Sequence, residues 1–82
     1  MIIAVACRIG QKIWTLPPPN RHHNVLWLMG EREVEGYHLC EQGFLTDSGD
    51  FLTRSAARSY AMATGQCPKP DHERHLFSED LW

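Results

Sequence analysis

Three consecutive prolines, Pro17 to Pro19, constrain the fold of this chain more than any other feature. Proline fixes φ and has no N–H group, so this run cannot continue a β ladder or lie inside a helix. It forms a stiff, extended connection instead. The residues before it must therefore complete one unit of structure, and a new element must begin after it.

The segment before the prolines, Met1 to Leu16, predicts a β-hairpin. The sequence IIAVACRI is apolar and β-branched, Gly10-Gln11-Lys12 supplies a turn, and IWTL forms the return strand. After the prolines, Asn20 is suited to cap a helix, because its side-chain oxygen can accept a hydrogen bond from a helix N–H group. Apolar residues then recur at helical spacing as far as Gly30, which predicts a short helix that ends there.

A second unit with the same order follows along the chain. Tyr37 to Thr53 predicts another hairpin around the turn Asp47-Ser48-Gly49-Asp50. Thr53 can cap a second helix, RSAARSYAMAT, and Gly65 is suited to end it. The last residues, LFSEDLW, finish on two apolar side chains, so we expect this tail to dock on the body of the domain.

The predicted fold is α+β, with the element order ββαββα: a small antiparallel sheet, two helices on one of its faces and a docking C-terminal tail. The 82 residues form a single domain, 1–82. A domain of this size buries only about 60% of the surface that its unfolded chain exposes. Its interior is too small for Trp14, Trp27 and Trp82 together, and we therefore expect an oligomer, in the first place a homodimer.

Composition excludes several classes of function. The formal net charge of −2 is too balanced for a protein that binds nucleic acid by charge, and too weakly acidic for a DNA mimic. The N-terminal apolar run has about six residues, against roughly 20 for a membrane span. Three cysteines without a close pair indicate a reducing interior rather than a disulfide framework. We expect a cytoplasmic protein that binds neither nucleic acid nor membrane.

Arg21, His22 and His23 place three potentially cationic side chains where the first helix begins. A helix N-terminus favours anions, so these residues do not stabilise the helix by charge. They suit a phosphate group, which arginine can bind with two hydrogen bonds. Arg54, at the start of the second helix, could bind the same anion. The alternative is structural, with His22 half-buried on the apolar helix face and His23 facing solvent.

A polar pair, Glu41 and Gln42, interrupts the strand sequence CEQGF. Gln42 offers both a donor and an acceptor, which suits the edge of a nucleobase, and Phe44 or Trp27 offers a ring for stacking. The alternative is an edge strand whose polar side chains meet water.

Metal and nucleophile chemistry have little support in this sequence. Cys67, His72 and His75 have a loosely zinc-like spacing, but a structural zinc site needs four ligands and no fourth is evident. No serine lies in a nucleophile motif, and no glycine-rich phosphate loop is present. We therefore predict no metal and no cofactor.

The segments RHHNV, EQGFLTDSGDFLTRSAARSYAMATGQ and LFSEDLW resemble a family of short proteins encoded by tailed bacteriophages and prophages. The resemblance covers most of the chain, except 31–38 and 68–75. It implies a phage accessory protein in the cytoplasm of an infected bacterium. Small phage proteins with a cationic pocket include counter-defence proteins that act on nucleotide immune messengers, such as cyclic dinucleotides and cyclic ADP-ribose compounds.

Three functions fit these observations. The preferred one is a counter-defence protein that binds and sequesters a phosphate-bearing nucleotide second messenger. Its predicted ligand-binding residues are Arg21, His22, His23, Glu41, Gln42, Phe44 and Arg54. The first alternative is a metal-independent phosphodiesterase in which His22 and His23 act as base and acid. The second alternative is an inhibitor that binds a host defence enzyme.

Overall fold

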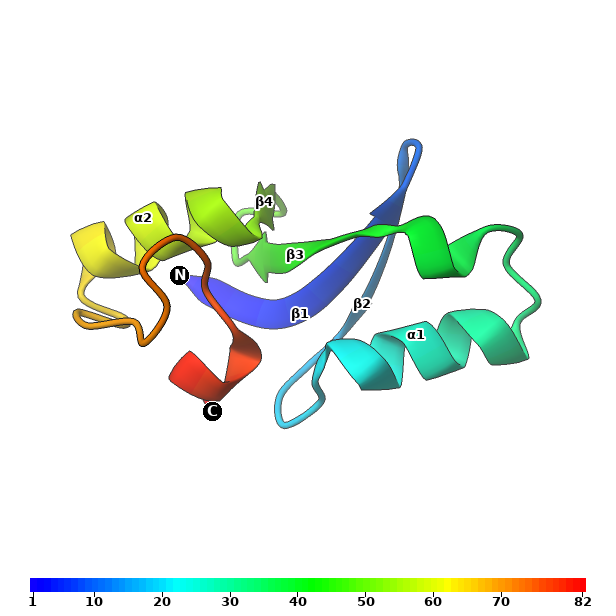
Figure 1. Cartoon of the computed structure of the whole chain (residues 1–82). Coiled ribbons are helices and arrows are strands. Elements are labelled where there is room, and N and C mark those ends of the chain that lie inside the picture. Colours follow the sequence, from blue (N-terminus) through cyan, green and yellow to red (C-terminus); the bar gives the residue numbers. More distant parts are fainter.

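The computed structural model describes all 82 residues and contains one four-stranded antiparallel sheet, in the order β2-β1-β3-β4. The strands are β1 (Ile2–Ile9), β2 (Lys12–Leu16), β3 (Glu41–Thr46) and β4 (Phe51–Thr53). The helices are α1 (His22–Glu31) and α2 (Arg54–Thr64), with two short 3-10 helices, η1 (Tyr37–Leu39) and η2 (Ser78–Asp80). The predicted α+β class and ββαββα order are confirmed (Figure 1).

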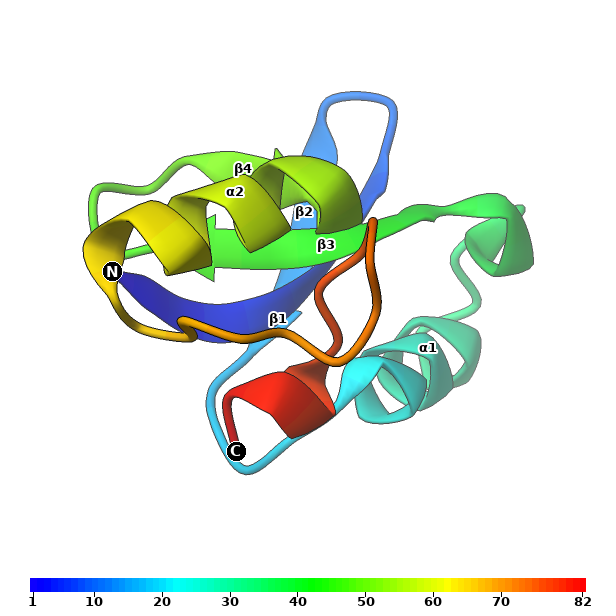
Figure 2. The same ribbon diagram turned by 60° about the vertical axis from the view of Figure 1, so that its left-hand side comes forward.

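Both helices pack on the same face of the sheet and share one core. α1 contacts β1 and β2, whereas α2 contacts β3 and β4 (Figure 2). Val25 and Met29 of α1 and Ala57 and Ala61 of α2 join the fully buried Phe44 of β3 in this core. The two alanines allow the backbone of α2 to approach the sheet closely. Neither helix combines the length and apolar character needed to span a membrane.

A β-bulge near the start of β1 decides which residues face the helices. Ile2 pairs with Thr46 of β3, and Ala4 pairs with Leu45, the residue before Thr46 on β3. Ile3 therefore has no partner on β3. Ile2 therefore points into the core, together with Val5 two residues beyond the bulge. Ala4 and the alternate residues after it face away from the helices.

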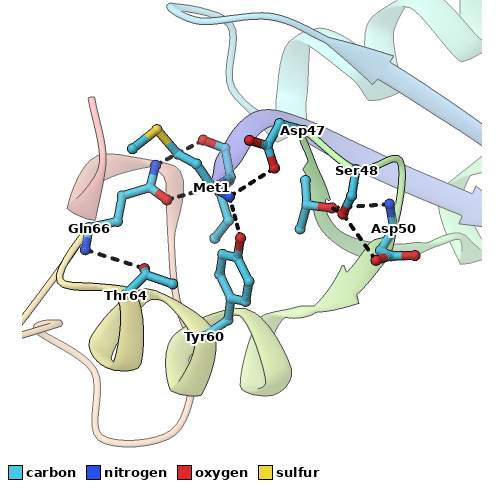
Figure 3. A network of polar contacts seen from close by, with 9 residues as sticks. Met1, Asp47, Ser48, Asp50, Tyr60, Thr64 and Gln66 are labelled. Carbon is cyan, nitrogen blue, oxygen red and sulfur yellow. Dashed lines mark hydrogen bonds and ion pairs between the residues drawn. The ribbon is translucent and has the colours of Figure 1, made fainter.

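The irregular start of β1 is held by polar contacts from the loop after α2 (Figure 3). The side-chain oxygen of Gln66 accepts a hydrogen bond from the N–H of Ile2 at 2.8 Å, and its amide nitrogen donates to the Ile2 carbonyl at 2.8 Å. The amino nitrogen of Met1 donates to Asp47 at 2.9 Å and also to the hydroxyl of Tyr60. Residues from β1, the β3–β4 turn and α2 thus converge at this end of the sheet.

The predicted boundaries of the second helix and of the β3–β4 turn are confirmed. Thr53 caps α2, because its Oγ1 accepts a hydrogen bond from the N–H of Ala56 at 3.2 Å. Gly65 follows α2 with φ of 80°, and Gly49 lies in the turn with φ of 89°. These are left-handed conformations that glycine adopts without strain.

Other predicted boundaries are wrong by a few residues. Arg21 rather than Asn20 precedes α1, and its N–H donates to the side chain of Asn24 at 2.8 Å. The helix continues through Gly30 to Glu31. The predicted strand from Tyr37 begins only at Glu41, since Tyr37 belongs to η1. Its ring packs against Gly30, 3.3 Å from the position that a Cβ atom would occupy, and this contact favours the 3-10 turn over an extended strand.

Candidate functional site

The C-terminal tail docks between the starts of the two helices, as predicted (Figures 1 and 2). Leu76 is fully buried, and Leu81 and Trp82 pack against the edge of the core. The indole N–H of Trp82 also donates to the carbonyl oxygen of Asn20 at 2.9 Å. The tail is therefore part of the folded domain, and it supplies partners for side chains at both helix starts.

Arg21 uses its guanidinium group to bind this tail. It donates to the hydroxyl of Ser78 at 3.0 Å and to the carbonyl oxygen of Trp82. The carboxylate of Glu79 lies 3.4 Å from Arg21. The guanidinium group of Arg21 is thus bound by partners from the chain itself.

His22 is buried inside the domain, with only 6% of its surface exposed. Its Nε2 lies 2.7 Å from the carbonyl oxygen of Gly43, and its ring packs edge-on against Phe44 with a centroid distance of 5.1 Å. Burial lowers the pKa of His22 to about 4, although the hydrogen bond to Gly43 opposes this effect. At neutral pH its ring is therefore uncharged and supplies no positive charge to a phosphate group.

Phe44 and His23 lie in opposite environments, one buried and one exposed. Phe44 is fully buried, so its ring presents no face for stacking. His23 is exposed on the outer side of α1 and points away from the core. The structure thus places His22 and Phe44 in the core, so neither ring is accessible at the surface.

An open pocket of about 460 Å³ lies at the start of α2, and we call it the α2 pocket. Its walls come from the start of β3, the β4–α2 junction and the loop before the tail. The lining residues are Cys40, Glu41, Gln42, Thr53, Arg54, Ser55 and His75. Three predicted site residues, Glu41, Gln42 and Arg54, therefore meet in one place. Arg21 and His23 do not line this pocket.

Arg54 is positioned in the α2 pocket by three contacts. It donates to the carbonyl oxygen of Leu76 at 3.0 Å and to the side-chain oxygen of Gln42 at 2.7 Å. Its guanidinium carbon lies 4.6 Å from the centre of the Phe77 ring, in a cation–π contact. Burial lowers the pKa of Arg54, but arginine remains charged in proteins. The pocket therefore contains a fixed positive charge.

Glu41 and Gln42, the polar pair at the start of β3, each bind a different arginine side chain. Gln42 lies beside Cys7 on the helix-covered face, where its oxygen binds Arg54. Its amide nitrogen thus remains as the donor end of the side chain. Glu41 pairs with Arg8, so its charge is compensated by a residue outside the α2 pocket. The predicted alternative, an edge strand with hydrated polar side chains, fits Glu41, because the pairing of β3 with β4 begins only at Gly43 and Glu41 is exposed.

Sequence reasoning missed Thr53, Ser55 and His75 as neighbours of this site. The Nδ1 atom of His72 accepts the backbone N–H of His75 at 3.1 Å, and the two rings stack with centroids 5.0 Å apart. This tight turn brings His75 to the pocket. The sequence HERH offers no signal for such a turn. Thr53 was predicted as a helix cap, and that role also places it at the pocket wall.

Cys7 lies beside the pocket lining but is not suited to act as a nucleophile. Burial raises the pKa of Cys7 to about 12, and the adjacent Cys40 thiol contributes to this increase. Cys7 is therefore protonated at neutral pH and inert as a nucleophile. No three potential metal-ligating side chains gather anywhere in the structure.

The fold and the α2 pocket define a small α+β domain with a cationic, polar pocket. The chain belongs to the Phage T4 y16D protein family, which matches residues 1–82. The predicted relationship to phage proteins is therefore confirmed at the level of the family. Among curated proteins and solved structures, none matches the chain.

Proposed function

We propose that this phage-family protein binds a phosphate-bearing small ligand in the α2 pocket. In the cytoplasm of an infected bacterium it would sequester a nucleotide second messenger of the host defence, of the cyclic nucleotide or cyclic ADP-ribose type. The observation that supports this proposal most directly is the set of donors at the pocket. Arg54, the amide nitrogen of Gln42 and the first turn of α2 all present N–H groups there.

The electrostatics of the pocket favour an anion. The guanidinium group has five N–H donors, and only two of these are paired within the chain. The N-terminus of α2 adds a partial positive charge and N–H groups that have no partner inside the helix. The carboxylate of Glu41 is neutralised by Arg8. A phosphate group in the pocket would therefore meet several donors and no uncompensated negative side chain on its wall.

Binding without cleavage is favoured over the phosphodiesterase alternative. A His22–His23 acid–base pair would need both rings within reach of the same phosphate. The ring of His22 is buried with its Nε2 bound to Gly43, whereas His23 lies on the outer side of α1. The α2 pocket holds one histidine, His75, and no second general acid or base that is free of a charge partner.

Calorimetry with a panel of mono-, di- and cyclic nucleotides tests this function. We expect binding by the wild type and a loss of about 10- to 150-fold in affinity for Arg54→Met, equivalent to roughly 1.5–3 kcal/mol for a charge-assisted contact. Arg32→Met is the matched control, because Arg32 is exposed beyond the end of α1. Ligand recovered intact after heat denaturation would support sequestration. Absence of binding across the panel would refute the proposed function.

Two large exposed side chains favour a second candidate function, an inhibitor that binds a host defence enzyme. Trp27 is 67% exposed on α1, and Leu39 is 80% exposed in η1. Exposed tryptophan side chains are enriched among the residues that contribute most to protein–protein binding. If this function is correct, Trp27→Ser removes protection in an infection assay but leaves nucleotide binding unchanged. The reverse result, with protection lost only in Arg54→Met, supports the nucleotide-binding function.

A further inference from the structure

Neither helix covers the face of the sheet opposite α1 and α2, and we call it the open face. Strand register places Ala4 and Arg8 of β1 and Glu41 and Leu45 of β3 on this face. Ile13 of β2 belongs to the same face, since it pairs with Arg8, and it is 40% exposed. Phe51 of β4 pairs with Leu45 and lies on this face as well, with the guanidinium carbon of Arg8 4.3 Å from the centre of its ring. Ala4 is only 4% exposed, so Arg8, Glu41, Leu45, Ile13 and Phe51 form the accessible part of the face. An antiparallel sheet can leave one face in water, but such a face is usually polar.

In each of two cross-strand pairs on the open face, the β1 residue and the β3 residue differ in charge or in size. Arg8 lies beside Glu41, a positive charge beside a negative one. Ala4 lies beside Leu45, a small side chain beside a large one. A two-fold axis that runs between β1 and β3, parallel to both, exchanges these two strands. In a second copy related by this axis, Glu41 comes opposite Arg8 and Leu45 comes opposite Ala4.

The open face is therefore complementary to itself in charge. Its two charges sum to zero, so a second copy meets no net repulsion although the chain as a whole has a charge of −2. Such a symmetric arrangement, in which the same patch binds itself, is the commonest form of protein dimer. We propose that the protein forms a two-fold symmetric homodimer in which the open faces of two copies stack. This inference is independent of ligand binding in the α2 pocket.

A charge-swap experiment tests this dimer with light scattering coupled to gel filtration. The wild type should have twice the chain mass of 9.4 kDa. Arg8→Glu gives the open face two negative charges, and Glu41→Arg gives it two positive charges. Each variant alone should therefore have the mass of one chain, while a mixture of the two should recover the mass of two. Because the pair within each chain is broken in both variants, recovery on mixing reports contacts between copies.

Two further variants separate dimerisation from folding. Ile13→Lys adds a charge to the open face without touching the Arg8–Glu41 pair, and we expect a folded monomer with a cooperative melting curve. Arg32→Glu changes the same type of charge at the end of α1, outside the open face, and should remain a dimer. A wild type with the mass of one chain at several hundred micromolar would overturn the proposal. A mixture of Arg8→Glu and Glu41→Arg that stays at the mass of one chain would overturn it as well.

Discussion

Acid should destabilise this protein through His22, and the size of the effect follows from the buried position of that residue. The neutral ring is held between Phe44 and the carbonyl oxygen of Gly43, and burial lowers its pKa to about 4 from an ordinary value of 6.5. In the unfolded chain the ring takes up a proton near pH 6.5. Between pH 6.5 and pH 4 the unfolded state therefore binds more protons than the folded state.

The free energy of unfolding must fall as the pH falls through this interval. Each pH unit within it contributes about 1.4 kcal/mol. The full interval between 6.5 and about 4 thus corresponds to about 3 kcal/mol from His22 alone. Above pH 6.5 the ring is neutral in both states, so His22 produces no pH dependence there. A loss of about 3 kcal/mol is a large part of the stability of a small domain.

Urea denaturation from pH 7.5 to pH 4, with His22→Gln as the reference variant, measures this contribution. A glutamine amide can donate to the Gly43 carbonyl but does not titrate. We expect the variant to be less stable than the wild type at pH 7.5, and the difference to shrink by about 3 kcal/mol at pH 4. Other acid-sensitive groups, such as Asp47, affect both proteins equally. A difference that stays constant across this range would refute the buried, neutral state of His22.

Three further predictions concern packing and charge. Leu76→Ala should lower the free energy of unfolding by about 2–5 kcal/mol in urea denaturation, because the side chain is fully buried; a loss below about 0.5 kcal/mol would mean that the tail is not docked. Gly43→Ala should prevent normal folding, since its Cβ would lie 2.1 Å from the carbonyl oxygen of Leu52; a native-like circular dichroism melt would contradict this strand pairing. Glu79→Gln should strengthen nucleotide binding about two- to fivefold in calorimetry, because its charge lies near Arg54; unchanged or weaker binding would contradict this electrostatic account.

The fold was predictable because the local signals agree with one another. The prolines at 17–19 separate the first hairpin from α1, Thr53 caps α2, and Gly49 and Gly65 occupy positions with positive φ. Periodicity alone placed Val25 and Met29 in the core. Boundaries failed where a tertiary contact decides the local structure, as where the ring of Tyr37 packs on Gly30.

The candidate site was only partly predictable because the identity of a residue does not reveal its partner. Arg21 and Arg54 both lie at a helix start, yet Arg21 binds the tail and Arg54 lines the α2 pocket. His22 lies on the same helix face as the apolar residues of α1, which predicts burial. Its imidazole ring, in contrast, predicts a role in binding phosphate, and the sequence does not decide between the two. The proximity of His75 to Gln42 depends on a loop between distant segments, and no local pattern encodes it.

We propose that phosphate binds at the start of α2 and not at the start of α1. A titration with inorganic phosphate and then with a cyclic dinucleotide, followed by amide chemical shifts in NMR spectra, tests this claim directly. We expect saturable shifts concentrated at Gln42, Arg54 and Ser55, with little change at His22 and His23. The absence of saturable shifts, or shifts concentrated at the start of α1, would contradict it.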